Sequence, residues 1–207
     1  MTEPRRRSKA TGEHPAQRAD ARRNRQRILR AADRAFAAEG TSVPLDRIAE
    51  VAGVGPGTVH RNFPRKDELL AAVLAVRLSD LAALAVERRK AADPGEAFFE
   101  FLGVLVERSR NNLALVTALA GPAEVSDLVR EAAGTLESAL AELLARAQSA
   151  GAVRADLDAR ELHALVAGIL TAEQRLPESA RGRGVALVAD GLRANLASSK
   201  PDKKGPV

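Results

Sequence analysis

Two very short helical patterns constrain the fold of this chain more than any other feature. They lie between Pro44 and Pro64 and read LDRIAEVAGV and GPGTVHRNF. Each is shorter than the roughly 12 residues that an isolated helix needs to be stable in water. Both segments must therefore pack against a longer element. Residues 20–40, with apolar side chains three and four positions apart and Gly40 as a stop signal, supply it.

The remaining sequence also repeats with a helical period. Apolar residues recur three and four positions apart, which predicts helices over residues 66–91, from 94 onward, and over 125–150, 158–176 and 184–196. No stretch alternates β-branched and polar residues as a half-buried strand does. We therefore predict an all-α protein.

The composition excludes several kinds of chemistry. The 207 residues include no Cys, so disulfides, thiolate metal sites and a cysteine nucleophile are excluded. The three histidines, His14, His60 and His163, share no metal-ligand spacing, and no glycine-rich phosphate loop follows a strand. We therefore predict no enzyme activity, no metal and no cofactor.

The sequence also argues against a membrane protein. We find no apolar run near the roughly 20 residues that cross a bilayer, and the basic N-terminus is not followed by the apolar core of a secretory signal. We predict a cytoplasmic protein with no membrane partner.

Positive charge is concentrated at the N-terminus. Residues 1–30 contain ten Arg and Lys against three Asp and Glu, whereas the whole chain has a net charge of only +5. The first 19 residues lack an apolar period and hold Pro4, Gly12 and Pro15, which predicts a disordered basic arm over 1–19. Such a charge split favours a polyanion partner, although a solvated tail would look the same.

The two short segments fit a helix-turn-helix, a motif whose second helix enters the DNA major groove. Ala49 is small enough for a second helix to approach closely, and Gly53 can adopt the positive φ that the turn needs. Val59 and Phe63, four residues apart, anchor the second helix. The side chains left for DNA are those of Thr58, His60, Arg61 and Asn62.

The segment IAEVAGVGPGTVHRNFPRKDELL (48–70) combines Ala-Gly-Val at the turn, Gly-Thr-Val at the second helix and a closing Phe-Pro-x-Lys-x-x-Leu. With these motifs, residues 22–75 resemble the DNA-binding domain of the TetR family of bacterial transcriptional repressors. The resemblance implies an N-terminal three-helix helix-turn-helix DNA-binding domain over 20–66. A helical effector-binding and dimerisation domain follows over 67–197, and 198–207 is expected to be a flexible tail.

The resemblance also implies roles for single residues. The recognition helix begins where its backbone N–H groups and the Thr58 hydroxyl meet a phosphate or a base edge. Asn62 stands where the family usually reads or brushes a base, and an Asn amide can pair bidentately with adenine. Lys66 stands where the family clamps a phosphate. Arg47 is added from its charge and position alone. The predicted DNA-binding residues are Arg47, Pro56, Gly57, Thr58, His60, Arg61, Asn62 and Lys66.

Two positions depart from the family pattern. His60 stands where the family usually has Tyr, and Gly55 where it commonly has Ser. A histidine that contacts phosphate can change its charge near neutral pH, so we expect operator affinity to weaken between about pH 6 and 8. The alternative is a neutral imidazole that only donates one hydrogen bond to phosphate.

The last two helical patterns carry apolar residues suited to a dimer interface. In the family the C-terminal domain dimerises, and here the helix over 158–176 has one large apolar stripe and a second stripe of Ala164, Gly168 and Ala172. A four-helix bundle between two subunits would cover both stripes. The alternative is a core within one chain. The predicted interface residues are Leu162, Leu165, Val166, Ile169, Val185, Val188 and Leu192.

The resemblance places an effector pocket among the helices of residues 66–150. Phe98 and Phe101 follow the core stripe, whereas Phe99 projects elsewhere. The chain has no Trp or Tyr, so we expect an apolar or weakly polar small molecule rather than a cation held by an aromatic cage. The predicted pocket residues are Phe99, Leu102, Val106, Ser109 and Thr117.

Together these features predict a homodimeric repressor that binds double-stranded DNA. A small-molecule effector would release it from a pseudo-palindromic operator. The alternative is a ligand-independent or architectural DNA-binding protein whose C-terminal domain only dimerises.

Overall fold

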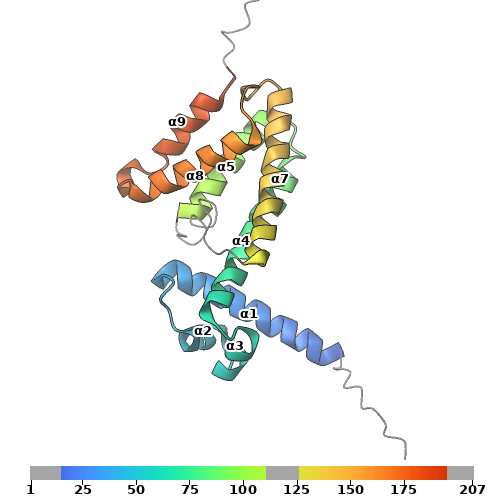
Figure 1. Cartoon of the computed structure of the whole chain (residues 1–207), viewed down its shortest axis with the longest axis vertical. Helices are drawn as coiled ribbons and strands as arrows, with labels where there is room; N and C mark the ends of the chain where they lie inside the picture. The colour runs from blue at the N-terminus through green and yellow to red at the C-terminus, as the bar shows by residue number, and fades with distance from the viewer. Residues whose placement is uncertain (1–14, 111–125, 195–207) are drawn as a thin grey trace, which may run out of the picture. The chain divides into compact units, whose positions relative to one another are not determined.

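A computed structural model describes residues 15–110 and 126–194 of the chain (Figure 1). The all-α prediction is confirmed: among these residues the one strand-like feature is an isolated bridge between Val153 and Arg193. The described elements are α1 (Pro15–Glu39), α2 (Leu45–Ala52), α3 (Pro56–Asn62), α4 (Lys66–Arg88), α5 (Pro94–Arg110), α7 (Asp127–Ser149), α8 (Ala159–Arg175), the 3-10 turn η1 (Glu178–Ala180) and α9 (Arg183–Leu192).

The chain forms two compact units, residues 1–70 and 71–207. The boundary between them lies within α4. The N-terminal unit contains α1 to α3, and the C-terminal unit contains α5, α7, α8 and α9.

The first helix begins earlier than the sequence pattern suggested. Helix α1 starts at Pro15, so residues 15–19 belong to the helix and not to a disordered arm. Proline suits this first helical position, because its missing N–H would have no partner there and its φ is already helical. The rest of the predicted arm, residues 1–14, lies outside the described residues, as does the predicted tail over 198–207.

The N-terminal unit packs the two short helices against α1 and against each other. Helix α1 contacts both α2 and α3, and α2 contacts α3. The side chains that fill this interior are buried to within a few per cent of their surface. They are Ile28, Ala31, Ala32, Ala35, Phe36, Ile48, Ala49, Ala52, Val59 and Phe63. Burial against α1 therefore stabilises α2 and α3, which are too short to be stable alone.

Gly53 forms the turn between α2 and α3 and has the positive φ that the sequence predicted. Its φ is 62°, and it caps α2 with its N–H directed to the carbonyls of Ala49 and Glu50. The N–H of Val54 then donates to the Ala49 oxygen at 3.1 Å, so the last carbonyls of α2 have partners. Pro56 opens α3 as its first helical residue, as expected for proline at this position.

Replacing Gly53 with alanine is expected to lower the free energy of unfolding by about 1–2 kcal/mol, because an L side chain at φ 62° is strained. An added Cβ would also lie 2.9 Å from Arg27 Nη2. Chemical denaturation of the full chain measures the change. Gly57→Ala is the control, because a Cβ at position 57 would have no atom within 4 Å and the φ of Gly57 is not positive. Equal stability of the two variants would contradict the prediction.

The C-terminal unit is built around α5, which contacts α7, α8 and α9. Phe98 and Phe101 of α5 are fully buried, together with Leu102, Leu105 and Leu143. Arg88, the last residue of α4, forms an ion pair with Glu100 of α5, and Arg89, which follows it, forms one with Glu142 of α7. Helix α8 opens with a capping box in which Asp158 and Glu161 each accept a hydrogen bond from the other's backbone N–H, at 2.8 and 2.9 Å.

The end of α9 is joined to the connection between α7 and α8. Arg154 N–H donates to the Leu192 carbonyl at 3.0 Å, and Ala194 N–H donates to the Ala152 carbonyl at 3.1 Å. Beside this pairing, the Arg154 side chain donates to both carboxylate oxygens of Asp156, at 2.6 and 2.5 Å. That hydrogen bond lowers the pKa of Asp156. The two backbone hydrogen bonds fix the position of α9 against the rest of the unit.

Helix α4 differs from the expectation that no segment could span a membrane. By length and composition alone its 23 residues could cross a bilayer. Half of the apolar window is buried inside the protein, and Arg77 and Asp80 lie within the helix. The core helix of a soluble protein passes the same test, so a single such helix is weak evidence for a membrane span.

Candidate nucleic-acid interface

Helix α3 presents most of the predicted DNA-binding side chains. Val59 is fully buried and Phe63, just after the helix, is 2% exposed, so these two side chains fix one face of α3 against the interior. The remaining faces carry the polar residues. Gly57, His60 and Arg61 are exposed, and Thr58 and Asn62 are half-buried. The spacing of the two anchors thus determines which side chains can reach a DNA groove.

Hydrogen bonds within α3 hold two of these side chains in place. Asn62 Nδ2 donates to the Thr58 carbonyl at 2.8 Å, and Arg61 Nη2 donates to Thr58 Oγ1 at 3.3 Å. An amide nitrogen carries two hydrogens, so the contact with Thr58 uses one of them. The other hydrogen and the carbonyl oxygen of Asn62 form the pair that an adenine requires. The contact therefore holds the side chain and leaves these two groups available.

Several charged residues near α3 in the sequence belong to α2 and to the start of α4. His60 Nε2 lies 3.6 Å from Asp46 Oδ1 on α2, and both side chains are exposed. Arg47, also on α2, pairs with Glu50 at 3.0 Å. Lys66 is the first residue of α4 and is half-buried. Asp46 was not predicted from the sequence, because its proximity to His60 depends on how α2 crosses α3.

The exposed polar and basic side chains of α3 can bind a polyanion. The described residues contain no group of three or more His, Asp or Glu side chains that could hold a metal ion. A short helix with a buried anchor face and an exposed polar face, preceded by a tight turn and a supporting helix, has the geometry of a recognition helix. The weakening of DNA binding between pH 6 and 8 through His60 stays a prediction.

Comparison with known proteins shows which family has this geometry. Residues 28–73 match the family model of bacterial regulatory proteins, tetR family, and residues 93–194 match that of the transcriptional regulator SbtR-like C-terminal domain. The crystal structure of the TetR transcription regulatory protein from Mycobacterium vanbaalenii is 42% identical, covers 86% of this chain and 99% of its own, and has a TM-score of 0.65. The chain belongs to the TetR family of bacterial transcriptional regulators.

Two further relatives support this assignment. TetR transcriptional regulator SCO0520 from Streptomyces coelicolor is 32% identical over 83% of this chain and 99% of its own, with a TM-score of 0.66. The HTH-type transcriptional regulator SrpR from Pseudomonas putida is 50% identical over 60 residues, which are 28% of each chain. The chain thus covers less than half of the length of the curated relatives that it matches. The resemblance inferred from residues 48–70 is confirmed, and the TetR family is one of regulators rather than enzymes.

Most of the predicted dimer-interface residues are buried within the C-terminal unit of this TetR-family chain. Leu162, Val166, Ile169 and Leu192 are at most 5% exposed, because they pack in the core formed by α5, α7, α8 and α9. Val185 and Val188 are half-buried against the same core. The four buried side chains offer little surface to a partner, and the prediction that the set forms the subunit interface stays a prediction.

The second stripe of α8 lies on the surface instead. Ala164, Gly168 and Ala172 are exposed, and Leu165 beside them is 40% exposed. On α9, which contacts α8, Leu187 is 64% exposed, more than any other large apolar side chain of the described residues. We call these five residues the α8–α9 face. Of the predicted interface residues, Leu165 belongs to it.

The predicted effector-pocket residues differ in their exposure. Leu102, Val106 and Ser109 are buried, and the Ser109 hydroxyl donates to the Leu105 carbonyl at 2.7 Å. Phe99 is half-buried: its ring packs edge-on to Phe98, with 5.2 Å between centroids, and the Arg193 guanidinium lies 4.3 Å above it. Thr117 lies outside the described residues.

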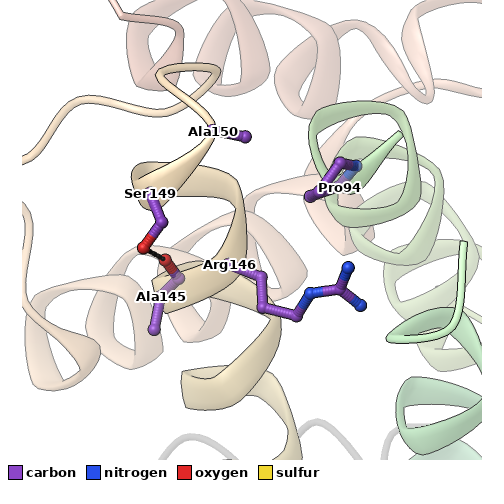
Figure 2. Close-up of a pocket in the computed structure, with 5 residues that line it drawn as sticks. All are labelled: Pro94, Ala145, Arg146, Ser149 and Ala150. Carbon is purple, nitrogen blue, oxygen red and sulfur yellow. Dashed lines mark hydrogen bonds between the residues drawn. The ribbon is translucent and has the colours of Figure 1, made fainter. Parts of the chain in front are cut away.

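Two cavities in the C-terminal unit involve residues that were not predicted from the sequence. A shallow cavity of about 430 Å³ lies between the start of α5 and the end of α7, with Pro94 and Arg146 on its two sides (Figure 2). A second, of about 330 Å³, lies between α7 and α8. Its polar side chains include Arg160 and His163, whose Nδ1 lies 3.5 Å from Glu137 Oε1. Helical periodicity could not find these sites, because it does not show which residues of two helices face each other.

Proposed function

We propose that this TetR-family chain is a dimeric repressor that binds a pseudo-palindromic DNA operator through α3 and is released by a small-molecule effector. The observation that carries the proposal is the exposed polar face of α3, held in place by the buried side chains of Val59 and Phe63. A helix anchored in this way can enter the major groove and present its side chains to base edges.

Each DNA-binding residue has a proposed role. Thr58, His60, Arg61 and Asn62 face the groove, with Asn62 reading a base. Arg47 and Lys66 contact the phosphates on either side, together with the backbone N–H groups near Pro56 and Gly57. Phosphate contacts set the orientation of the protein on the duplex, whereas base contacts select its sequence. The proposed DNA-binding domain covers residues 20–66, and the effector and dimerisation domain covers 67–197.

The α8–α9 face is the proposed dimer interface. A cluster of exposed Ala and Gly lets two helices approach closely, and Leu165 on α8 and Leu187 on the adjoining α9 add exposed apolar area. Pairing of this face with its copy forms a four-helix bundle with two-fold symmetry. Such a dimer carries two α3 helices and therefore requires an operator with two inverted half-sites.

The proposed effector is an apolar or weakly polar small molecule that binds in the C-terminal unit, with Phe99 at the edge of its site. A second candidate function is ligand-independent DNA binding. In that case the C-terminal unit only dimerises.

Selection of DNA fragments that bind the full chain tests the proposed function, because it yields the operator and its symmetry together. We expect enrichment of one inverted repeat from fragmented genomic DNA or from random duplexes. A gel-shift screen of small molecules on that repeat then distinguishes the two candidates: release by a compound supports the effector-controlled repressor. Binding without any sequence enrichment would contradict a repressor and indicate an architectural protein.

Replacing Asn62 with alanine is expected to weaken operator binding by about 10- to 100-fold, since a bidentate Asn–adenine pair contributes about 1–3 kcal/mol of discrimination. Binding to an unrelated duplex should be unchanged, because that binding depends on phosphate contacts. Fluorescence anisotropy with the two duplexes measures both affinities. Asn24→Ala, on the half-buried surface of α1, is the control. A parallel loss on both duplexes would mean that Asn62 does not read a base.

A further inference from the structure

Two arginines of α1 contact the two ends of the region that contains α3. Arg27 Nη2 donates a hydrogen bond to the Gly53 carbonyl, at 2.9 Å, in the turn before α3. The Arg25 guanidinium lies 4.3 Å above the ring of Phe63, the residue that ends α3. Because Arg25 and Arg27 lie in a basic N-terminal region, their charges suggest phosphate contacts. Their contacts within the protein indicate a different role.

The contact between Arg27 and Gly53 fixes the turn. The carbonyls at the end of a helix have no partner within it and need one from outside. Arg27 supplies such a partner for Gly53 from a helix 26 residues earlier in the chain. The φ of 62° at position 53 favours glycine, and a Cβ there would lie 2.9 Å from the same nitrogen, so it would displace the end of the Arg27 side chain. The guanidinium is therefore directed at the backbone of the turn.

The contact between Arg25 and Phe63 fixes the other end. Phe63 is almost completely buried, and its N–H donates to the Val59 carbonyl at 2.8 Å, so its position and that of the last turn of α3 are linked. Arg25 is half-buried, which fits a side chain that covers the Phe63 ring. A guanidinium over an aromatic face is attracted by the ring's negative face and also excludes water from it.

These two contacts matter because α3 has only seven residues. So short a helix is unstable without contacts to other elements, which also set its orientation. A side chain that reads a base must be placed to within a fraction of an ångström. We propose that Arg25 and Arg27 are positioning residues, which set where Thr58 and Asn62 meet the operator, rather than phosphate contacts. The proposal rests on the proposed DNA-binding function.

The salt dependence of DNA binding separates the two roles. An arginine that contacts a phosphate releases a counterion, so its removal makes the fall of log affinity with log salt less steep by about 0.9 and weakens binding to every duplex. A positioning arginine should leave the slope unchanged and weaken binding to the operator alone. We compare Arg27→Gln with Arg22→Gln. Arg22 is an exposed arginine of the same helix, and its replacement removes the same charge.

The experiment uses the full chain, the inverted repeat recovered by selection, and a duplex of unrelated sequence. We expect Arg27→Gln to weaken operator binding about tenfold, as for loss of one hydrogen bond from a charged group, with little change on the unrelated duplex. Arg27→Lys, which keeps a charged donor, should recover part of the loss. Arg25→Met, which keeps apolar cover over Phe63, should show the same pattern with about a threefold loss.

Several results would overturn the proposal. One is a salt dependence of log affinity that is less steep by about 0.9 for Arg27→Gln, together with equal losses on both duplexes, because that is the behaviour of a phosphate contact. Another is unchanged operator affinity for both Arg27→Gln and Arg25→Met. Circular dichroism at the assay temperature shows whether each variant is folded. If Arg27→Gln does not fold, Arg27→Lys and Arg25→Met decide the matter. Failure of the wild-type chain to enrich any sequence would instead contradict the proposed function.

Discussion

Replacing Leu187 with glutamate is expected to dissociate the proposed dimer and to weaken operator binding about 100-fold, the effect of losing a central interface residue. Leu187 is 64% exposed on α9, so in a single chain a charge there costs little. In a two-fold dimer, however, the substitution places two carboxylates on the same buried face. Each must lose its water without gaining a partner, and the two repel each other.

Sedimentation equilibrium of the full chain measures the mass, and anisotropy on the inverted repeat measures the affinity. Leu128→Glu is the matched control, because Leu128 is 48% exposed at the start of α7 and lies outside the α8–α9 face. The control should remain dimeric and bind the operator normally. A Leu187→Glu protein with the mass of a dimer would show that the subunits associate through another surface.

The helix-turn-helix was predictable because its constraints are local. Gly53 needs a positive φ, Pro56 fits only the first turn of a helix, and Val59 and Phe63 are four residues apart. Each of these requirements depends on a few neighbouring residues and not on the rest of the fold. The start of α1 is ambiguous from sequence because a proline such as Pro15 occurs both in disordered segments and at the first position of a helix.

Contacts between distant segments could not be predicted in this way. The sequence showed two apolar stripes on α8, but it could not show which of them faces α5 and α7. The larger side chains, such as Leu162 and Ile169, turned out to fill the chain's own core, and the stripe with Gly168 lies outside. Similarly, a count of charges treats all α1 arginines alike, whereas Arg27 contacts a carbonyl 26 residues away.

Replacing Phe101 with alanine is expected to lower the free energy of unfolding by about 3–5 kcal/mol, as for other buried phenylalanines. Its ring is fully buried in the core shared by α5, α7, α8 and α9, so its removal leaves a cavity that the surrounding helices fill only in part. Urea denaturation followed by circular dichroism measures the change. A loss below about 1 kcal/mol would mean that this part of the core repacks or is already loosely packed.

Phe99→Ala is the informative comparison, because Phe99 belongs to the same helix but is only half-buried. It loses the edge-on contact with Phe98 and the contact with Arg193, which together account for about 1–2 kcal/mol. The variant should therefore fold and bind the operator at ordinary temperature. Any change in its release by a small molecule then reports on the effector site rather than on stability. If Phe101→Ala and Phe99→Ala are equally destabilised, Phe99 belongs to the core, and the proposed pocket edge must lie elsewhere in the C-terminal unit.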